Sequence, residues 1–274
     1  MSVHTVSVLG CGWLGLPLAE QLARRGLTVR GSTTTPEKKE PIREAGADPH
    51  LVRVGRDVEG DDLPGFFGVD LLVFTLPPSG SDDVPYPDRA AAVHRAAEAH
   101  GTGWVIMTSS TSVYPDLDRT VTETDAGAEP GLPLHRHGPD VLAAERALAS
   151  NAYDLTVLRL AGLYGYGRHP ARYFAGRHDI PDGDAPVNLV HRDDVIGAIE
   201  AVLEREARGE IFNVCAEAHP ARRHLYPAAA QRLGLEPPTF ADGSPAPFKR
   251  VSCRRLKERL DYRHRYPDPM EPAP

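Results

Sequence analysis

The sequence of 274 residues is poor in cysteine and contains no long apolar run. Its three cysteines, Cys11, Cys215 and Cys253, lie far apart and form no Cys-x-x-Cys pair, so we expect neither a disulfide framework nor a cysteine metal site. No stretch of about 18 apolar residues occurs, so no membrane-spanning helix is predicted. The first residues enter an apolar segment without a basic start, and we therefore expect no secretory signal and a cytoplasmic protein.

Basic residues are also fewer than acidic residues. The 31 Lys and Arg residues are outnumbered by 38 Asp and Glu residues, which gives a formal net charge of -7. Nucleic-acid binding draws its affinity from clustered Lys and Arg, so we expect no nucleic-acid partner. One local group of basic residues, at 249–259, is expected to form a solvated face. The composition therefore indicates a protein that works without nucleic acid or membrane.

Short apolar runs alternate with amphipathic stretches in the first half of the chain. This alternation is typical of β-α-β units, in which helices cover both faces of a parallel sheet. The pattern therefore predicts an α/β fold with a doubly wound parallel sheet of the Rossmann type. Strands are predicted at residues 4–9, 27–31, 50–54, 70–76, 104–108 and 155–160, and helices at 87–100 and 139–149.

Proline and glycine are frequent between residues 162 and 187, where the regular alternation stops. Such a loop-rich segment suits a substrate-binding cap. We therefore predict a dinucleotide-binding Rossmann domain at 1–160 and a small C-terminal substrate lobe at 161–274. Within the lobe, short strand-like runs predict that residues from about 187 to 215 return to the sheet.

The segment Gly10-Cys11-Gly12-Trp13-Leu14-Gly15 is a GxGxxG motif that leaves the first predicted strand and enters a helix. In this context the glycines make a tight turn, let the backbone approach a pyrophosphate and let the helix pack closely on the strand. The helix N-terminus adds N–H groups and a partial positive charge. We therefore expect these six residues to bind a nicotinamide dinucleotide, the alternative being a purely structural turn.

The second predicted strand discriminates between NAD and NADP. An NAD site usually places Asp or Glu about 20 residues further on, where the carboxylate binds the ribose 2′-hydroxyl. No acidic residue occurs between residues 27 and 36, where donors and cations suit a 2′-phosphate instead. The cofactor is therefore predicted to be NADP, with NAD as the alternative. The expected contacts are Arg30, Ser32, Thr33, Thr34 and Lys38, which equally suit a helix start with Thr35 as N-cap.

Four further segments carry a family resemblance. They read WVIMTSSTSVYP at 104–115, LRLAGLYGYGR at 158–168, VNLVHRDDV at 187–195 and EIFNVCAE at 210–217. In this order, and together with the GxGxxG motif, the sequence resembles the extended and atypical short-chain dehydrogenase/reductase superfamily, whose members include NAD-dependent epimerase/dehydratase-like proteins. The resemblance implies an active site between the Rossmann domain and the C-terminal lobe, at the carboxyl ends of the strands.

The resemblance gives Ser110 a catalytic role, because a hydroxyl four residues before the Tyr of the Val-Tyr pair helps to polarise the substrate carbonyl. The alternative is that the serines of this segment only satisfy backbone groups of a loop. The family's Tyr-x-x-x-Lys pair is absent, since His137 and Val141 stand at its positions. A Tyr phenol needs a nearby ammonium to lower its pKa for proton transfer, so the usual mechanism does not carry over.

His137 is the candidate replacement, because imidazole titrates near neutral pH without a neighbouring cation. The alternative is a surface residue ahead of the Gly138-Pro139 turn. The pair His135 and His137 lacks a companion Cys or an HExxH helix, so no metal is expected. No serine lies in a GxSxG elbow, which argues against a hydrolase triad.

The remaining expected site residues lie on or near the segments named above. Expected cofactor contacts are Leu76, Pro77, Ser109, Ala161 and Leu163. Expected substrate contacts are Thr111, Tyr114, Arg168 and His191. His191 has a structural alternative, in which it joins a strand to a helix whose N-cap is Asp193 or Asp194.

We predict an NADP(H)-dependent oxidoreductase or epimerase-like enzyme that moves a hydride between the cofactor and a carbonyl or alcohol carbon of a small molecule. The alternative is a catalytically inactive dinucleotide-binding sensor or scaffold, which the missing Tyr and Lys favour. The predicted helices at 87–100 and 139–149 are the candidate faces of a homodimer, or they pack only on the sheet.

Overall fold

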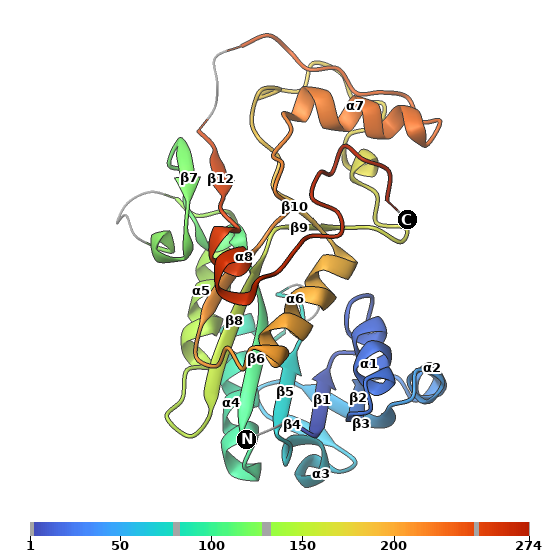
Figure 1. The fold of residues 1–274 in the computed structure, drawn as a ribbon, viewed down its shortest axis with the longest axis vertical. Helices are drawn as coiled ribbons and strands as arrows, with labels where there is room; N and C mark the ends of the chain where they lie inside the picture. The colour runs from blue at the N-terminus through green and yellow to red at the C-terminus, as the bar shows by residue number, and fades with distance from the viewer. Residues whose placement is uncertain (1–2, 79–82, 128–132, 244–246, 274) are drawn as a thin grey trace. The chain divides into compact units, whose positions relative to one another are not determined.

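The computed structural model describes residues 3–78, 83–127, 133–243 and 247–273 (Figure 1). The chain forms two compact units, each built from segments that lie far apart in the sequence. The first unit comprises Met1–Val113, Arg136–Leu158 and Val202–Ile211. The second unit comprises Tyr114–His135, Arg159–Ala201 and Phe212–Pro274. The chain therefore passes repeatedly from one unit to the other.

An eight-stranded sheet with the order β11-β8-β6-β5-β1-β2-β3-β4 is the framework of the first unit. The parallel strands at its centre are β1 (Thr5–Leu9), β2 (Thr28–Thr33), β3 (Asp48–Val54), β5 (Leu71–Phe74) and β6 (Trp104–Ser110), and β4 (Val58–Gly60) pairs antiparallel with β3. Strands β8 (Asp154–Leu160) and β11 (Ile211–Val214) begin in the first unit and end in the second. Because the chain moves outward from β1 in both directions, the predicted α/β fold with a doubly wound sheet is confirmed.

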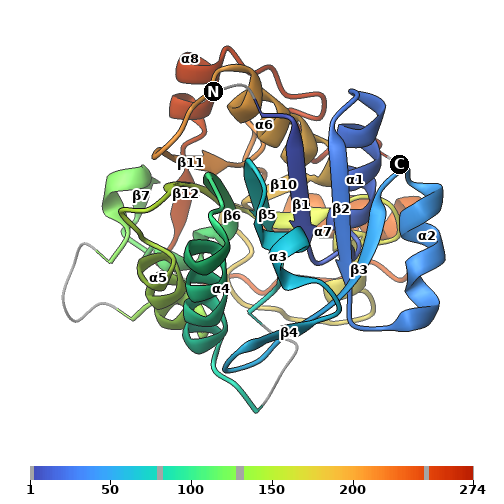
Figure 2. The same cartoon turned by 90° about the horizontal axis from the view of Figure 1, so that it is seen from below.

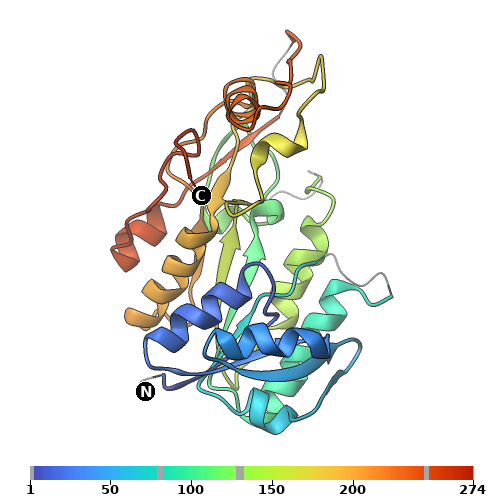
Figure 3. The same ribbon diagram turned by 90° about the vertical axis from the view of Figure 1, so that its right-hand side faces the viewer.

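The central strands bury both of their faces, as helix-covered parallel strands do. All four residues of β5 are fully buried, and so are Val6 and Val8 of β1. Figure 2 shows α1 on one face of this sheet and α3, α4 and α5 on the other, and Figure 3 shows α1 beside α2, against which it packs. These helices are α1 (Gly15–Arg24), α2 (Lys39–Glu44), α3 (Leu63–Phe67), α4 (Tyr86–His100) and α5 (Gly138–Ala147).

The second unit contains two small parallel pairs of strands. β9 (Gly162–Tyr164) pairs with β10 (Leu189–His191), and β7 (Arg119–Val121) pairs with β12 (Lys249–Val251). This unit also contains α7 (Arg222–Arg232), α8 (Arg254–Leu260) and most of α6 (Arg192–Glu204). A hydrophobic cluster that includes Tyr164, Leu225 and Tyr226 joins β9 to α7, and Met270 packs against it. Apolar contact therefore connects the C-terminal residues to β9 and α7.

The carboxylate of Asp194, in the first turn of α6, fixes the C-terminal segment of the second unit. Asp194 is fully buried and accepts hydrogen bonds from the Tyr262 hydroxyl at 2.8 Å and from the backbone N–H groups of Arg265 and Tyr266 at 2.7 and 3.0 Å. Gly197 leaves room for this arrangement, since a Cβ atom there would lie 2.5 Å from the Tyr262 hydroxyl. Asp194 is therefore a long-range anchor. The predicted N-cap, Asp193 or Asp194, is wrong, because α6 begins at Arg192 and both residues lie in its first turn.

We expect Asp194→Asn to lower the free energy of unfolding by about 2–4 kcal/mol, because an amide brings N–H groups to a place where three donors already converge. Chemical denaturation followed by circular dichroism measures the change. Glu258→Gln is the matched control, since Glu258 is exposed and forms a surface ion pair with Arg254 at 3.8 Å, a kind of pair that contributes little to stability. An Asp194→Asn protein as stable as the control would show that this anchor contributes nothing.

Candidate functional site

The GxGxxG loop connects β1 to α1 and is fastened to the neighbouring strand β2. The backbone N–H of Gly10 donates to Ser32 Oγ at 2.8 Å, and that of Cys11 donates to the Ser32 carbonyl at 2.9 Å. Inside the loop, the N–H of Gly12 donates to the Gly10 carbonyl at 2.8 Å. Ser32 is buried, so this residue, predicted as a cofactor contact, anchors the loop through its hydroxyl.

The three glycines of the motif meet different surroundings. Gly10 has a φ of +105°, and a Cβ atom there would lie 2.9 Å from Thr75 Oγ1, while a Cβ atom on Gly15 would lie 2.1 Å from the Gly10 carbonyl oxygen. Both glycines are therefore required by the chain itself. A Cβ atom on Gly12 would meet no atom of the described residues within 4 Å. The fold itself would therefore tolerate a side chain at this position. A diphosphate that approaches the backbone would not, because the side chain would fill the space it needs.

The start of α1 is suited to an anion. Its N-cap residue is Leu14, which makes no side-chain cap, and no acidic residue occurs in the first turn. A helix N-terminus carries a partial positive charge from its N–H groups, and an anionic ligand is stabilised there. The open side of Gly12 and this helix start adjoin each other in the chain, so the loop fits the diphosphate of a dinucleotide.

The residues at the end of β2 and just after it fall into two groups: those whose side chains already bond to other residues, and those that are exposed. Thr33 Oγ1 accepts a hydrogen bond from the Thr35 N–H at 3.1 Å, and Lys39 Nζ pairs with Asp61 at 2.7 Å. Thr34 and Lys38 are exposed. These two are therefore the members of the predicted set that face solvent at the end of β2.

Arg30 and Cys11 lie deeper around the same loop. Arg30 Nη1 is buried and has no hydrogen-bond partner among the residues that the structure describes. The Cys11 side chain packs on Gly31, where a Cβ atom would lie 2.7 Å from its sulfur. Burial raises the pKa of the Cys11 thiol to about 12. The cysteine of the motif is therefore a packing residue that stays protonated at neutral pH.

The segment after β5 is held by two buried side chains of α4. The Tyr86 hydroxyl donates to the Leu76 carbonyl at 3.1 Å, and Arg89 Nη2 donates to the carbonyls of Pro77 and Pro78 at 3.1 and 2.9 Å. Leu76 and Pro77 were predicted as cofactor contacts from the sequence. Tyr86 and Arg89 were not identified there, because their partners are backbone groups that carry no sequence signal.

The hydroxyls that follow β6 have separate roles. Ser109 is buried and donates to Glu145 Oε1 of α5 at 2.5 Å. The Ser110 side chain is partly exposed, and its Oγ accepts from the Ser112 N–H at 3.1 Å. Thr111 is buried in a short 3₁₀ turn. Glu145 escaped the sequence analysis as a site residue, although an acid on the buried face of a helix, beside Ala144, is a signal that could have found it.

His137 and Val141 belong to the start of α5. His137 is the N-cap residue, is partly exposed, and accepts the Val141 N–H through its backbone carbonyl at 3.0 Å. The Val141 side chain is 1% exposed, so the position that carries a Lys in the resembling family is here part of the apolar core. Ser110 and His137 both lie in the first unit, while His135 belongs to the second.

Tyr114 was predicted to contact substrate, and the structure encloses it. Its side chain is fully buried, its hydroxyl donates to Asn213 Oδ1 at 2.6 Å, and it accepts from Arg159 Nη1 at 3.0 Å. Arg159 also donates to the Glu123 carbonyl at 2.8 Å. Because this network surrounds the hydroxyl, Tyr114 is a structural residue of the second unit and not a surface for substrate.

His191 was also predicted to contact substrate and is fully buried. Its Nδ1 accepts from the Asp193 N–H at 3.2 Å, and its ring packs against those of Tyr164, Tyr166 and Tyr266. A Cβ atom on Gly165 would lie 2.3 Å from His191 Nε2. His191 therefore has the structural role given as the alternative to substrate contact, because it joins β10 to α6.

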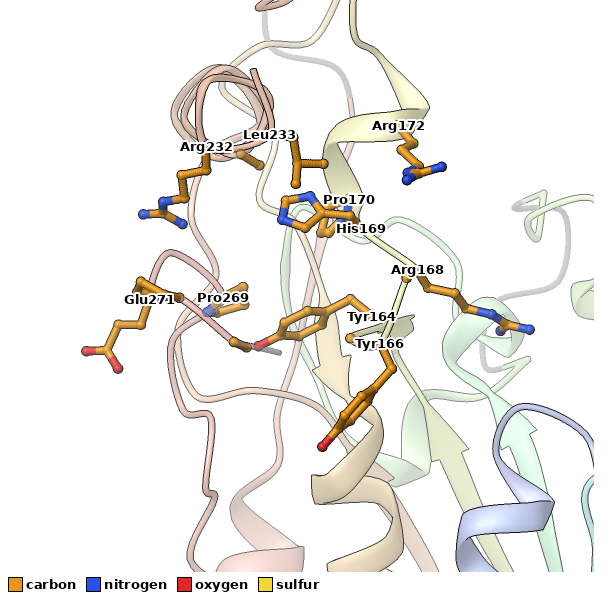
Figure 4. Close-up of a pocket in the computed structure, with 15 residues that line it drawn as sticks. Tyr164, Tyr166, Arg168, His169, Pro170, Arg172, Arg232, Leu233, Pro269 and Glu271 are labelled. Atoms are coloured by element: carbon orange, nitrogen blue, oxygen red, sulfur yellow. The ribbon is translucent and has the colours of Figure 1, made fainter. Parts of the chain in front are cut away.

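The other predicted residues of the second unit lie on or near β9. The Ala161 N–H donates to the Val214 carbonyl at 3.0 Å, and Leu163 pairs with Val190 of β10. Arg168 is exposed and lines a cavity of about 370 Å³ (Figure 4). The cavity lies between the segment after β9, the end of α7 and the residues around Pro269. Of the predicted substrate residues, Arg168 therefore borders this cavity.

Two further properties concern the described part of the chain alone. No helix within it is both long enough and apolar enough to cross a membrane. No cluster of three or more His, Cys, Asp or Glu side chains within it is arranged to hold a metal ion.

Sequence comparison places this chain beside two curated proteins. It is 42% identical over 271 residues to protein YeeZ of Escherichia coli strain K12, and the match covers 97% of both chains. It is 35% identical over 169 residues to the 3-diazoavenalumate denitrifying reductase of a Streptomyces species, covering 56% of this chain and 53% of that protein. No family model matches the chain.

Solved structures share the fold over nearly the whole chain. A functionally unknown conserved protein from Silicibacter pomeroyi has a TM-score of 0.78 at 29% identity, covering 97% of this chain and 95% of that one. A short-chain dehydrogenase/reductase superfamily protein from Agrobacterium tumefaciens, solved with bound NAD, has a TM-score of 0.71 at 19% identity, covering 94% and 92%. The chain belongs to the family of protein YeeZ of Escherichia coli.

Proposed function

We propose that this protein binds a nicotinamide dinucleotide at residues 10–15. The observation that carries the proposal is the open side of Gly12, where the fold leaves space for a Cβ atom and the sequence has none. The uncapped start of α1 supports it, because the diphosphate gains from the partial positive charge there. The bound cofactor supplies or accepts a hydride at its nicotinamide ring. The protein's part is to hold it and to exclude competing reactions.

The proposed cofactor is NADP(H). Thr34 and Lys38 are exposed just after β2 and would bind the 2′-phosphate, whereas Lys39 is already paired with Asp61. No acidic side chain precedes them in β2 to bind a ribose 2′-hydroxyl in the manner of NAD enzymes. NAD remains the alternative, and the related structure from Agrobacterium tumefaciens holds that nucleotide.

The proposed reaction is hydride transfer between the cofactor and a carbonyl or alcohol carbon of a small molecule. Ser110, partly exposed at the end of β6, would donate a hydrogen bond to the substrate oxygen. His137, partly exposed at the start of α5, would exchange the proton in place of the absent Tyr and Lys. The name of the Streptomyces relative, a reductase, supports reduction as the reaction class.

A sensor or scaffold without catalysis is the second candidate. The observation that favours it is the buried Val141, because an apolar side chain at this position supplies no ammonium to a proton donor. Such a protein would bind the cofactor and turn over no carbonyl compound. The two candidates therefore agree on the cofactor and differ on turnover.

Gly12→Asp is expected to weaken NADPH binding at least about a hundredfold, because a carboxylate would occupy the open side of the loop and repel the diphosphate. Fluorescence titration measures the binding. Gly243→Asp is the matched control, since a Cβ atom at Gly243 likewise meets none of the described residues within 4 Å. Both variants are expected to melt at the temperature of the unchanged protein. Equal NADPH affinity of the two variants would contradict the assignment of the loop.

Lys38→Gln is expected to weaken NADPH binding about fivefold and to leave NADH binding unchanged, because one exposed ion pair with the 2′-phosphate is lost. Lys39→Gln removes the same charge one residue further on and is expected to change neither affinity, since Lys39 pairs with Asp61. Calorimetric titration of both variants with both nucleotides provides the comparison. An equal loss for NADH and NADPH would exclude a 2′-phosphate contact at Lys38.

Ser110→Ala is expected to lower turnover about a hundredfold with little change in NADPH affinity, as for the loss of one donor to a developing oxyanion. His137→Gln is expected to lower turnover in the same assay with little change in NADPH affinity, because the side chain proposed to exchange the proton is lost. NADPH oxidation measured across a panel of aldehydes and ketones gives both results. An unchanged protein that binds NADPH and oxidises it with no member of a broad panel supports the sensor instead.

A further inference from the structure

A cavity of about 370 Å³ lies wholly within the second unit (Figure 4). Its volume is in the range of sites that bind small molecules. Tyr164 and the segment that follows it form one wall, and Ala229, Arg232 and Leu233 from the end of α7 form another. The C-terminal residues from Pro269 to Ala273 close a further side. All of these segments belong to one unit, so the cavity is a feature of that unit alone.

Two polar rings stand among the apolar side chains that line this cavity. Figure 4 shows the rings of Tyr164 and His169 beside Leu233 and Pro269. The Tyr164 side chain is 5% exposed, and its hydroxyl has no hydrogen-bond partner among the described residues. His169 Nδ1 accepts from the Ala171 N–H at 3.3 Å, which leaves Nε2 as the N–H donor of the neutral ring. The cavity therefore combines an apolar lining with two hydrogen-bonding groups.

Positively charged residues outnumber acidic ones among the residues that line this cavity. Arg168, Arg172 and Arg232 are among its lining residues, and Glu271 is the one acidic residue among them. Figure 4 shows Arg232 on one side of His169 and Arg172 on the other, with the Glu271 carboxylate at the outer edge. The pKa of His169 is lowered by burial and then by the charges of Arg232 and Arg172. The two guanidinium groups therefore flank this ring from opposite sides.

We propose that the cavity binds a small molecule in which an anionic group, a carboxylate or a phosphate, is attached to an apolar body. The anion would be stabilised by Arg172 and Arg232 and would accept a hydrogen bond from His169 Nε2. The apolar body would lie against Leu233, Pro269 and the Tyr164 ring. The Tyr164 hydroxyl would then gain the partner that a buried polar group requires. The proposal does not depend on the cofactor, so its failure leaves the proposed function untouched.

The test uses three probes of similar shape on the full chain: benzoate, phenyl phosphate and the neutral benzamide. NMR titration of the His169 ring, assigned by comparison with His169→Gln, reports the charge beside it. A bound anion favours the protonated ring, so we expect benzoate or phenyl phosphate to raise the pKa of His169. The better of these two probes identifies the anionic group. Benzamide is expected to leave the pKa unchanged.

Arg172→Gln and Arg232→Gln are each expected to weaken binding of the better anionic probe at least about tenfold. Arg172→Gln is the cleaner change, because Arg232 also donates to the Met270 carbonyl and its replacement removes a hydrogen bond to the C-terminal segment. Arg263→Gln, an exposed arginine of the same unit that does not line the cavity, is the matched control and is expected to bind normally. Three results would each overturn the proposal. Benzamide could bind as tightly as benzoate, the Arg172→Gln protein could bind the anionic probe with unchanged affinity, or no probe could shift the His169 signal.

Discussion

The backbone of Gly15 lies so close to the Gly10 carbonyl that no Cβ atom fits between them, and the geometry of the proposed cofactor site depends on this contact. It determines where β1 ends and where α1 begins, while two hydrogen bonds to Ser32 keep the loop on β2. The start of α1 is thereby held against the loop with its partial charge unopposed by any acidic residue in its first turn. Of the three glycines of the motif, Gly12 is the one that has room for a Cβ atom, and a ligand would use that space.

The segments that carry the family resemblance are joined to one another by buried polar contacts. Tyr114, Arg159 and Asn213 come from three of these segments and form one hydrogen-bonded network. A fourth segment contributes His191, enclosed by aromatic rings, and Asp194, which holds the C-terminal residues. Much of the recognisable pattern therefore preserves the framework of the second unit. This explains how the chain can show the pattern while the Tyr and Lys that the family resemblance implies are absent.

The main strands and the long helices were predictable from the sequence because their apolar periods extend over whole elements. The three-residue strands β4, β7 and β12 were not, since so short a segment has no period to read. Hydrogen-bond partners that are distant in the chain could not be predicted from the sequence either. Asp194 reads locally as an N-cap, yet its partners lie 68 to 72 residues away. The cofactor loop could be predicted as a motif, but the different surroundings of Gly10, Gly12 and Gly15 required coordinates.

The most direct test of the central claim is a crystal structure of the protein grown with NADPH. The account predicts the diphosphate beside the backbone of Gly12, with its oxygens about 3 Å from N–H groups at the start of α1. It also predicts the 2′-phosphate near Thr34 and Lys38. A nucleotide bound elsewhere on the chain, or a loop that stays empty at saturating NADPH, would contradict the claim that the open side of Gly12 is a cofactor site.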